Sequence, residues 1–306
     1  MNGLSGIAAF RSGISLLALA FLALFLLYPL WLVLQASVVD EDTGRFALTN
    51  YTQILASSYY LGGIRNSLVA GAWTTLLATL LAVPLAFCLA RIDLPGKAAL
   101  MTLVALPLVV PSFVSAYALV LLFGHAGVIT VALRSVGIPI QSIYGMTGIV
   151  IVFTFNLYPY VLMPTVAGFK AIDISIEESA RNLGGSRWYV FRTVLLPVVM
   201  PAVLAGALLV FVETLENFGV PAVLAEDRPF LALDIFKLFA GESDSNVGAA
   251  GALSVLLIVC AAAILLLQRH YLARRRYATG ARRAPPAIPL GGGWRALAAC
   301  RTLVFV

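Results

Sequence analysis

Residues 178–197 read ESARNLGGSRWYVFRTVLLP, a polar and charged stretch that lies between two long apolar segments. Charged side chains are costly in the hydrocarbon core of a bilayer, so such a stretch lies outside the membrane while its neighbours can cross it. It contains landmarks separated first by three and then by nine residues: Glu178-Ser179-Ala180, Gly184, Val194, and finally Leu196-Pro197. The stretch therefore predicts a structured connection between two membrane-spanning helices.

The composition of the whole chain points to a membrane protein. Of its 306 residues, 61% are hydrophobic and 11% are charged, whereas about 25% of the residues of an ordinary soluble domain are charged. This balance excludes a soluble globular protein and indicates several membrane crossings. The net charge of +6 does not indicate nucleic-acid binding, because the basic residues are concentrated in the loops on one side.

Six segments are long and apolar enough to span a membrane as helices, which takes about 20 residues for a hydrocarbon core about 30 Å thick. They cover roughly residues 14–37, 68–90, 99–123, 146–167, 198–220 and 248–268. The first exceeds the apolar part of a signal peptide, about 7 to 15 residues, and we interpret it as a retained helix. We expect Pro107 and Pro111 to bend the third helix, because proline removes a backbone donor.

Lysine and arginine residues are unevenly distributed between the two sets of loops, and the richer side is expected to be cytoplasmic. The richer set contains Arg11, Arg91, Lys97, Lys170, Arg181, Arg187, Arg192, Arg269, Arg274, Arg275, Arg276, Arg282 and Arg283. The poorer set contains Arg45, Arg65, Arg134, Arg228 and Lys237, together with the acidic groups Asp40-Glu41-Asp42 and Glu226-Asp227. We therefore predict a multi-pass protein of the bacterial inner membrane with its N-terminus and residues 168–197 in the cytoplasm.

The landmarks of residues 178–197 resemble the EAA loop, E-A-A-x3-G-x9-I-x-L-P, of the membrane subunits of bacterial ABC importers. Every internal distance is kept, and the two departures are Ser179 for the first alanine and Val194 for isoleucine. The resemblance implies an all-α polytopic protein with the six-helix, type-1 ABC importer (MetI-like) architecture. No G-x-x-x-x-G-K phosphate-binding loop occurs here, so ATP and Mg²⁺ are expected in a partner ATPase and no cofactor on this chain.

The order of the elements and two further phrases, SIYGMTGIVIVFTFNLYPYVLM at 142–163 and ENFGVPAVL at 216–224, resemble the ferric-iron type permeases. Those are usually fused proteins of two homologous halves, and this sequence resembles the first half and the opening of the second. The resemblance implies half of a translocation path for a substrate delivered by a periplasmic binding protein, with ferric iron expected. Relatives that handle 2-aminoethylphosphonate, polyamines or sulfate look similar, and these substrates stay open. The implied partners are cytoplasmic ATPase subunits, the binding protein, a second permease half and the lipid bilayer.

Three regions follow from this interpretation. Residues 1–61 hold the N-terminal helix and a periplasmic segment, and residues 62–268 form the importer transmembrane domain with its cytoplasmic loop at 168–197. Residues 269–306 begin as a basic, then Pro- and Gly-rich linker. The chain then reads WRALAACRTLVFV, which is too short to span a bilayer. We interpret it as the start of a seventh helix, cut short, that opens a second half; a short interfacial tail is the alternative.

Within the loop we predict two short helices joined by a turn at Gly184-Gly185, because glycine permits positive φ and lets a partner approach closely. Glu177 and Glu178 are expected near the start of the first helix, where the helix dipole favours negative charge. Pro197 suits the first turn of the next spanning helix, where its missing N–H is not needed. An ordinary amphipathic loop is the alternative.

Glu213 and Glu216 are the acidic residues within the six predicted spans. Three positions apart, they share one face of a helix, and Asn217 lies beside them. Intramembrane carboxylates usually face a bundle interior or a water-filled cavity, so we predict that these residues line the substrate path. The alternative places Glu216 in headgroup water and pairs Glu213 with a neighbouring helix.

Catalytic and metal-binding patterns are absent from the sequence. Cys88, Cys260 and Cys300 lie at unrelated spacings and His125 and His270 are far apart, so we predict neither a metal site nor an enzyme. A membrane enzyme would need a motif such as HExxH or GxSxG. A secondary transporter would need inverted repeats or intramembrane charge pairs. Co-purification with an ATPase would distinguish the importer from both classes.

Overall fold

The computed structural model describes residues 14–39, 44–138, 142–241 and 246–274. Six helices of this described part are long and apolar enough to span a membrane: Ile14–Val38, Ser58–Arg91, Ser112–Ser135, Met146–Ala171, Arg187–Glu216 and Val247–His270. The predicted all-α polytopic class is therefore confirmed. The predicted seventh helix and most of the basic linker lie outside the described residues.

The described residues pack as two units, and the first holds residues 14–39, 44–61, 234–241 and 246–259. Its elements are η1 (Ala23–Leu27), α2 (Tyr28–Val38), α3 (Thr49–Ala56), most of α13 (Leu231–Ala240) and the first part of α14 (Val247–Arg274). Buried Asn50 donates to the carbonyl oxygens of Ser37 and Val39, at 3.4 Å in each case. A Cβ at Gly251 would lie 3.0 Å from the carbonyl oxygen of Val33, so glycine allows close helix packing in this unit.

The second unit holds residues 62–138, 142–233 and 260–274 of the described part. It contains nearly all of α4 (Ser58–Arg91), then α5 (Lys97–Ala105), η2 (Leu106–Leu108), α6 (Ser112–Phe123), α7 (Val128–Ser135), α8 (Met146–Ala171), α9 (Ile174–Asn182), α10 (Arg187–Val190), η3 (Phe191–Leu195), α11 (Leu196–Glu216) and α12 (Gly219–Leu224). This unit contains the main hydrophobic core and the residues that the sequence singles out.

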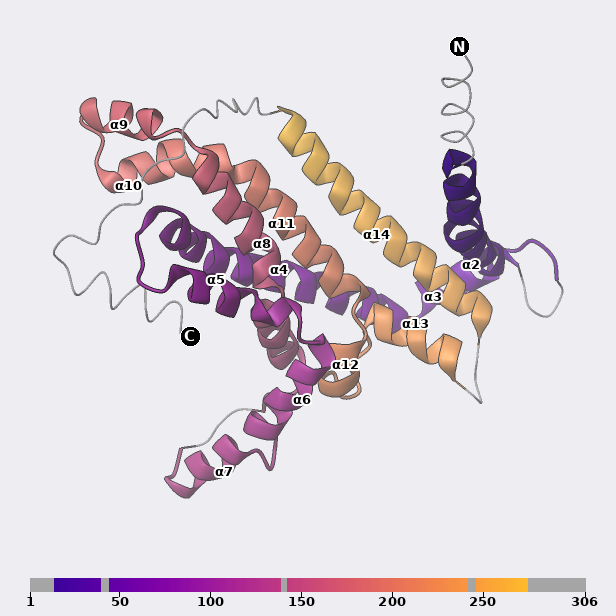
Figure 1. Cartoon of the computed structure of the whole chain (residues 1–306). Coiled ribbons are helices and arrows are strands. Elements are labelled where there is room, and N and C mark those ends of the chain that lie inside the picture. Colours follow the sequence, from indigo (N-terminus) through magenta and orange to yellow (C-terminus); the bar gives the residue numbers. More distant parts are fainter. Residues whose placement is uncertain (1–13, 40–43, 139–141, 242–245, 275–306) are drawn as a thin grey trace, which may run out of the picture. The chain divides into compact units, whose positions relative to one another are not determined.

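Helix α8 is the most buried spanning helix and lies at the centre of this core. It packs along α11, beside which it runs in Figure 1. The two backbones approach closely at Gly206 of α11, where an added Cβ would lie 2.5 Å from the Cα of Val161. Small residues allow spanning helices to pack backbone to backbone, because lipid tails provide no hydrophobic drive between helices.

The predicted third span, 99–123, is wrong. The chain forms α5 and the 3-10 turn η2, then leaves the helix and begins α6 at Ser112. Pro111 has extended ψ of 135°, and a proline also disfavours helical geometry at the residue before it. Pro107 lies inside η2, where the backbone stays helical, whereas the helix is broken at Pro111 and not merely bent, so the third spanning segment starts at Ser112.

Two other predicted spans have shifted ends. The second span is the C-terminal part of α4, which begins at Ser58 and is 34 residues long. The fifth was expected to continue to residue 220, but α11 ends at Glu216. There the Oδ1 of Asn217 accepts a hydrogen bond from the backbone N of Val220 at 3.1 Å. This side-chain bond supplies a cap that competes with continuation of the helix.

Candidate functional site

The connection between α8 and α11 contains the two short helices predicted for it, α9 and α10. Asp173 precedes α9, and its side chain accepts a hydrogen bond from the backbone N of Ser175 at 2.9 Å. Ser186 precedes α10 and accepts from the backbone N of Tyr189 at 3.2 Å. Each side chain satisfies a donor that the start of a helix leaves unpaired. Glu177 lies in the first turn of α9, as predicted from the helix dipole.

Gly184 makes the turn between the two helices. It has φ of +90°, a conformation that L-residues with a Cβ rarely adopt. The backbone N of Gly184 donates to the carbonyl of Arg181 at 2.9 Å, and that of Gly185 to the carbonyl of Ala180 at 3.1 Å. This nested pair is the Schellman arrangement that ends α9. No atom of the described residues lies within 4 Å of a Cβ built at Gly184, so the predicted need for glycine at this turn is confirmed as a need for positive φ.

The loop carries an exposed apolar surface that sequence reasoning missed. Leu183 is 90% exposed, Trp188 68% and Tyr189 59%. They surround the Gly184 turn, and Glu178 and Ser179 on α9 are exposed beside them. The sequence did contain a signal for this surface, because a leucine, a tryptophan and a tyrosine occur close together in an otherwise charged loop. We define Glu178, Leu183, Gly184, Trp188 and Tyr189 as the loop surface.

The other residues of the landmark sequence face inward. Ala180, Val194 and Leu196 are partly buried and pack against the hydrophobic core. The landmark sequence thus combines two sets of residues, one that anchors the loop and one that it presents to its surroundings.

Pro197 lies in the first turn of α11, as predicted, but the spanning helix as a whole begins earlier. Helical structure runs without interruption from Arg187 to Glu216. The π-helical turn η3 comes immediately before Leu196, whose backbone N donates to the carbonyl of Phe191. A wide turn of this kind accommodates a residue that cannot continue the normal hydrogen-bond pattern. The proline therefore lies within a continuous helix, at the junction between η3 and α11.

Aromatic rings hold both ends of the loop against α4. Phe87 of α4 lies 5.6 Å from Phe169 at the end of α8 and 5.1 Å from Phe191 at the start of η3, between ring centroids and with edge-to-face geometry. Trp188 stacks on Phe191 at 5.6 Å. Aromatic pairs prefer offset or edge-to-face geometries of this kind, with centroids about 4.5–7 Å apart. The loop ends are thus fixed to α4.

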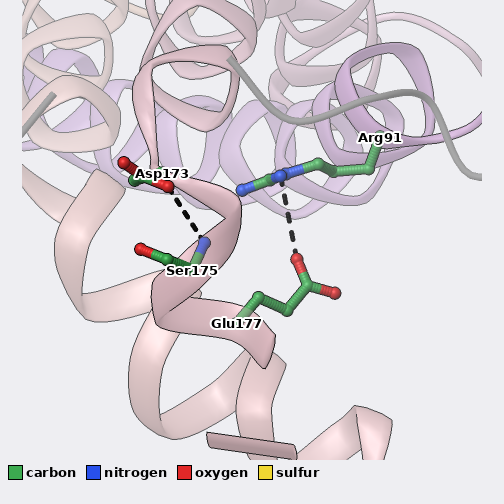
Figure 2. Close-up of polar contacts among 4 residues, drawn as sticks. All are labelled: Arg91, Asp173, Ser175 and Glu177. Carbon is green, nitrogen blue, oxygen red and sulfur yellow. Dashed lines mark hydrogen bonds and ion pairs between the residues drawn. The ribbon is translucent and has the colours of Figure 1, made fainter. Parts of the chain in front are cut away.

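An ion pair joins α4 to α9 (Figure 2). The Nη1 of Arg91, at the C-terminal end of α4, lies 3.7 Å from the Oε2 of Glu177. The Arg91 side chain is 2% exposed and that of Glu177 18% exposed. Sequence reasoning placed both residues on the basic side of the membrane but did not pair them. The sequence signal for this ion pair was an arginine at the end of one apolar helix and an acidic residue at the start of another helix.

Lys97 adds to the positive charge at this end of the unit. Its Nζ donates to the carbonyl oxygen of Ile92 at 3.2 Å. Burial lowers the pKa of Lys97, the nearby charge of Lys170 lowers it further, and Asp93 opposes the shift.

The predicted polar residues of α11 do lie beside polar groups of other helices. Glu213 interacts with the hydroxyl of Tyr160 on α8, and the charge of Glu216 is close enough to act on both groups. Asn217 donates to the hydroxyl of Ser112 on α6 at 2.7 Å. Glu213 is half-buried and Glu216 exposed. Glu213 therefore contacts α8, and Asn217 contacts α6.

A second polar contact lies between α6 and α8. Ser115 donates to the Oδ1 of Asn156 at 2.9 Å. The described residues offer no hydrogen-bond partner to the buried Nδ2 of Asn156. They also contain no group of three or more His, Cys, Asp or Glu side chains placed to hold a metal ion.

A family model described as "Binding-protein-dependent transport system inner membrane component" matches residues 78–277, more than half of the chain. The chain belongs to this family. The match includes α8, the whole loop and α11, and it agrees with the resemblance inferred from the landmark spacing. Members of the binding-protein-dependent transport family are membrane components of transporters, so the chain is a multi-pass transport subunit of the inner membrane and not an enzyme. Family membership also excludes the secondary-transporter alternative.

Relatives within the binding-protein-dependent transport family have different substrates in their names. The molybdate/tungstate transport system permease WtpB of Thermococcus kodakarensis is 33% identical over 56% of this chain and 63% of its own length. The spermidine/putrescine permease PotB of Haemophilus influenzae is 28% identical over 71% and 79%. A putative ferric transport system permease, FbpB 1, of Haemophilus influenzae is 29% identical over 76% and 37%. The chain thus spans less than two thirds of the first and the third of these.

Solved structures of ABC transporters share the fold. A chain of a bacterial alginate ABC transporter, crystallised with a periplasmic protein bound to an alginate pentasaccharide, superposes with a TM-score of 0.75 at 19% identity, covering 89% of this chain and 96% of that chain. A chain of the MetNI methionine ABC transporter in an inward-facing conformation gives 0.57 at 17% identity, covering 71% and 97%. The predicted type-1 importer architecture is therefore confirmed.

Proposed function

We propose that this chain forms half of the translocation path of an ATP-driven importer and that its 168–197 loop seats on a cytoplasmic ATPase subunit. A periplasmic binding protein delivers the substrate, and a second permease half, fused or separate, completes the path. ATP and Mg²⁺ bind the ATPase. Nucleotide-driven movement of the ATPase then shifts the loop, and the helices change between inward-facing and outward-facing states.

The observation that carries this proposal is the loop surface. Large apolar side chains at 59–90% exposure are unusual on a loop that water surrounds, and clustered exposed apolar groups mark interaction sites. Trp and Tyr are also the side chains that contribute most at protein interfaces. The open space beside Gly184 lets a partner approach the backbone of the turn.

Co-purification tests the assembly. A tagged full-length chain, extracted from native membranes in mild detergent, should bring down a nucleotide-binding subunit with ATPase activity. Trp188→Glu should release that subunit, because it places a charge in an apolar contact. Val136→Glu is a matched control, since Val136 is 67% exposed at the end of α7, away from the loop. A wild-type chain that never retains an ATPase would contradict the proposal.

We also propose that the N-terminus and the 168–197 loop face the cytoplasm, as the distribution of basic residues suggests. In a variant without the natural cysteines, an impermeant thiol reagent added to intact spheroplasts should label a cysteine at Asp227 and leave one at Arg187 unlabelled. Both positions are exposed, so access and not burial decides the result. Labelling of the Arg187 position in sealed cells would reverse the orientation and remove the argument for an ATPase contact.

For the substrate we propose ferric iron, with polyamines, 2-aminoethylphosphonate, sulfate and molybdate as alternatives. Support comes from a relative named as a putative ferric permease that aligns with 76% of this chain. Glu213 and Glu216 are carboxyl groups on one helix of the proposed path, and such groups would favour a cation, iron or polyamine, over an oxyanion. Radiolabelled iron uptake by the complete complex, competed with spermidine and with molybdate, distinguishes these substrates.

Glu213→Gln is expected to slow uptake severalfold while the amount of folded protein stays normal. The amide keeps a hydrogen-bonding group for Tyr160 but removes the charge that attracts a cation. Uptake per folded molecule in liposomes is the measurement, and Glu216→Gln, at an exposed neighbouring position, is the matched comparison. If Glu213 only pairs inside the bundle, Tyr160→Phe should instead lower the yield of folded protein, because a half-buried carboxylate loses its partner. Normal uptake at a normal protein level would remove Glu213 from the path.

A further inference from the structure

The junction between α4 and the loop contains one buried charge whose hydrogen bonds are incomplete. Arg91 is 2% exposed, yet a single atom of its guanidinium, Nη1, is near a carboxylate oxygen, at 3.7 Å. Nε and Nη2 are buried, and the described residues give them no hydrogen-bond partner. A guanidinium can form two parallel hydrogen bonds to a carboxylate. The contact with Glu177 is therefore looser than the chemistry of the two groups allows.

The two charges lie at helix ends that favour them. Arg91 is in the last turn of α4 and Glu177 in the first turn of α9, so each complements the dipole of its own helix. Asp173 caps α9 through Ser175, which fixes where the helix starts and hence where Glu177 lies (Figure 2). The cation at the C-terminal end of α4 thus faces the anion at the N-terminal end of α9.

Phe87 lies one helical turn before Arg91 on α4, so the two side chains share a face. Phe87 contacts the two ends of the loop, through Phe169 and Phe191, whereas Arg91 contacts α9, which carries part of the loop surface. The aromatic rings therefore hold the loop ends in place. Arg91 is the polar contact from α4 to the part of the loop that a partner would move.

We propose that Arg91 is a positioning residue for energy coupling, which transmits displacement of α9 to α4 through Glu177. When a partner presses α9 toward α4, the carboxylate can take both guanidinium branches, and α4 then moves with the loop. When α9 retreats, the contact loosens. This inference rests on the proposed function of the loop and adds the element that receives its movement.

The decisive variants alter the two charges in the complete importer, with its second permease half, ATPase and binding protein. Arg91→Gln leaves Glu177 partly exposed to water, so folded protein should persist. Uptake per ATP hydrolysed should fall roughly tenfold, the change that corresponds to a coupling energy of about 1.4 kcal/mol. Basal ATPase activity should remain. Arg65→Gln, which removes an exposed cation from the N-terminal part of the same helix, should leave the ratio unchanged.

A charge exchange separates positioning from stability. Arg91→Glu alone should uncouple the complex, and the double variant Arg91→Glu with Glu177→Arg should recover a large part of the ratio. If Arg91 variants do not accumulate, Glu177→Gln tests the same contact from the more exposed side. Normal coupling in Arg91→Gln or in Glu177→Gln would overturn the proposal, as would a loss of uptake that only follows the amount of folded protein. A wild-type complex that lacks an ATPase would overturn the proposed function instead.

Discussion

Replacing Gly184 with valine should abolish uptake while the protein still inserts into the membrane. The residue has φ of +90°, a region from which a β-branched side chain is nearly excluded. The helix-ending bonds from Gly184 and Gly185 would then be lost, and the loop surface would change shape. Because the turn lies at the exposed tip of the loop, the core formed by α8 and α11 should still fold. Uptake in liposomes and the amount of membrane-inserted protein are the measurements.

Two further substitutions identify which property of Gly184 is needed. Asparagine tolerates positive φ better than other residues with a Cβ, and nothing inside the chain obstructs it. If backbone geometry decides the effect, Gly184→Asn should keep much of the uptake that valine loses. If a partner must touch the backbone, asparagine and valine should be equally harmful, and the ATPase should dissociate in both.

Glu178→Lys, which reverses an exposed charge beside the turn, is expected to uncouple transport from ATP hydrolysis. Full uptake in Gly184→Val and Glu178→Lys would exclude a coupling role for the loop.

Gly206→Ala should remove most of the folded protein. A Cβ at this position would lie 2.5 Å from the Cα of Val161 and as near to the backbone of Tyr160, and backbone cannot move aside as a side-chain tip can. Overpacking a tight core contact costs about 1–3 kcal/mol in typical cases, and a clash with backbone belongs at the upper end. Detergent-solubilised yield and thermal unfolding of the purified protein measure the effect.

Gly168→Ala is the matched control for Gly206. Gly168 lies at the contact between the same two helices. A Cβ added there would lie 3.4 Å from the side chains of Ala202 and Val199, which is an ordinary contact. Alanine has the higher helix propensity, so this variant should be as stable as the natural protein or slightly more stable. Equal loss of folded protein in both variants would show that α8 and α11 do not pack as described.

The sequence predicted those features of the fold that depend on local composition. Apolar length determined the number of spans, and the Gly184 turn followed from the conformational freedom of glycine. The proline effects were predicted less well, because a proline's outcome depends on its surroundings. Pro111 has an extended backbone just before α6 begins, whereas Pro197 lies in a continuous helix, just after the wide turn η3.

Contacts between distant elements could not be read from the sequence. The pairing of Arg91 with Glu177 depends on where the ends of α4 and α9 meet, and 86 positions separate the two residues (177 − 91 = 86). The same holds for Glu213 and Tyr160, which share no sequence pattern but face each other from adjacent helices. Their residue types suggested polar sites, and only the packing supplies the partners.

The loop is connected differently to the two spanning helices that flank it, because α10, η3 and α11 form one continuous helix. From Arg187 onward the chain is a single rod of 30 residues, so tilting the loop end of this rod swings its other end in the opposite direction. On the α8 side, Ile172 and Asp173 are extended, with ψ of 128° and 134°, so the helix is interrupted there for two residues. The loop is therefore joined to α11 by unbroken helix and to α8 by two extended residues, so the path to α8 is the one that a change of a few backbone dihedrals could alter.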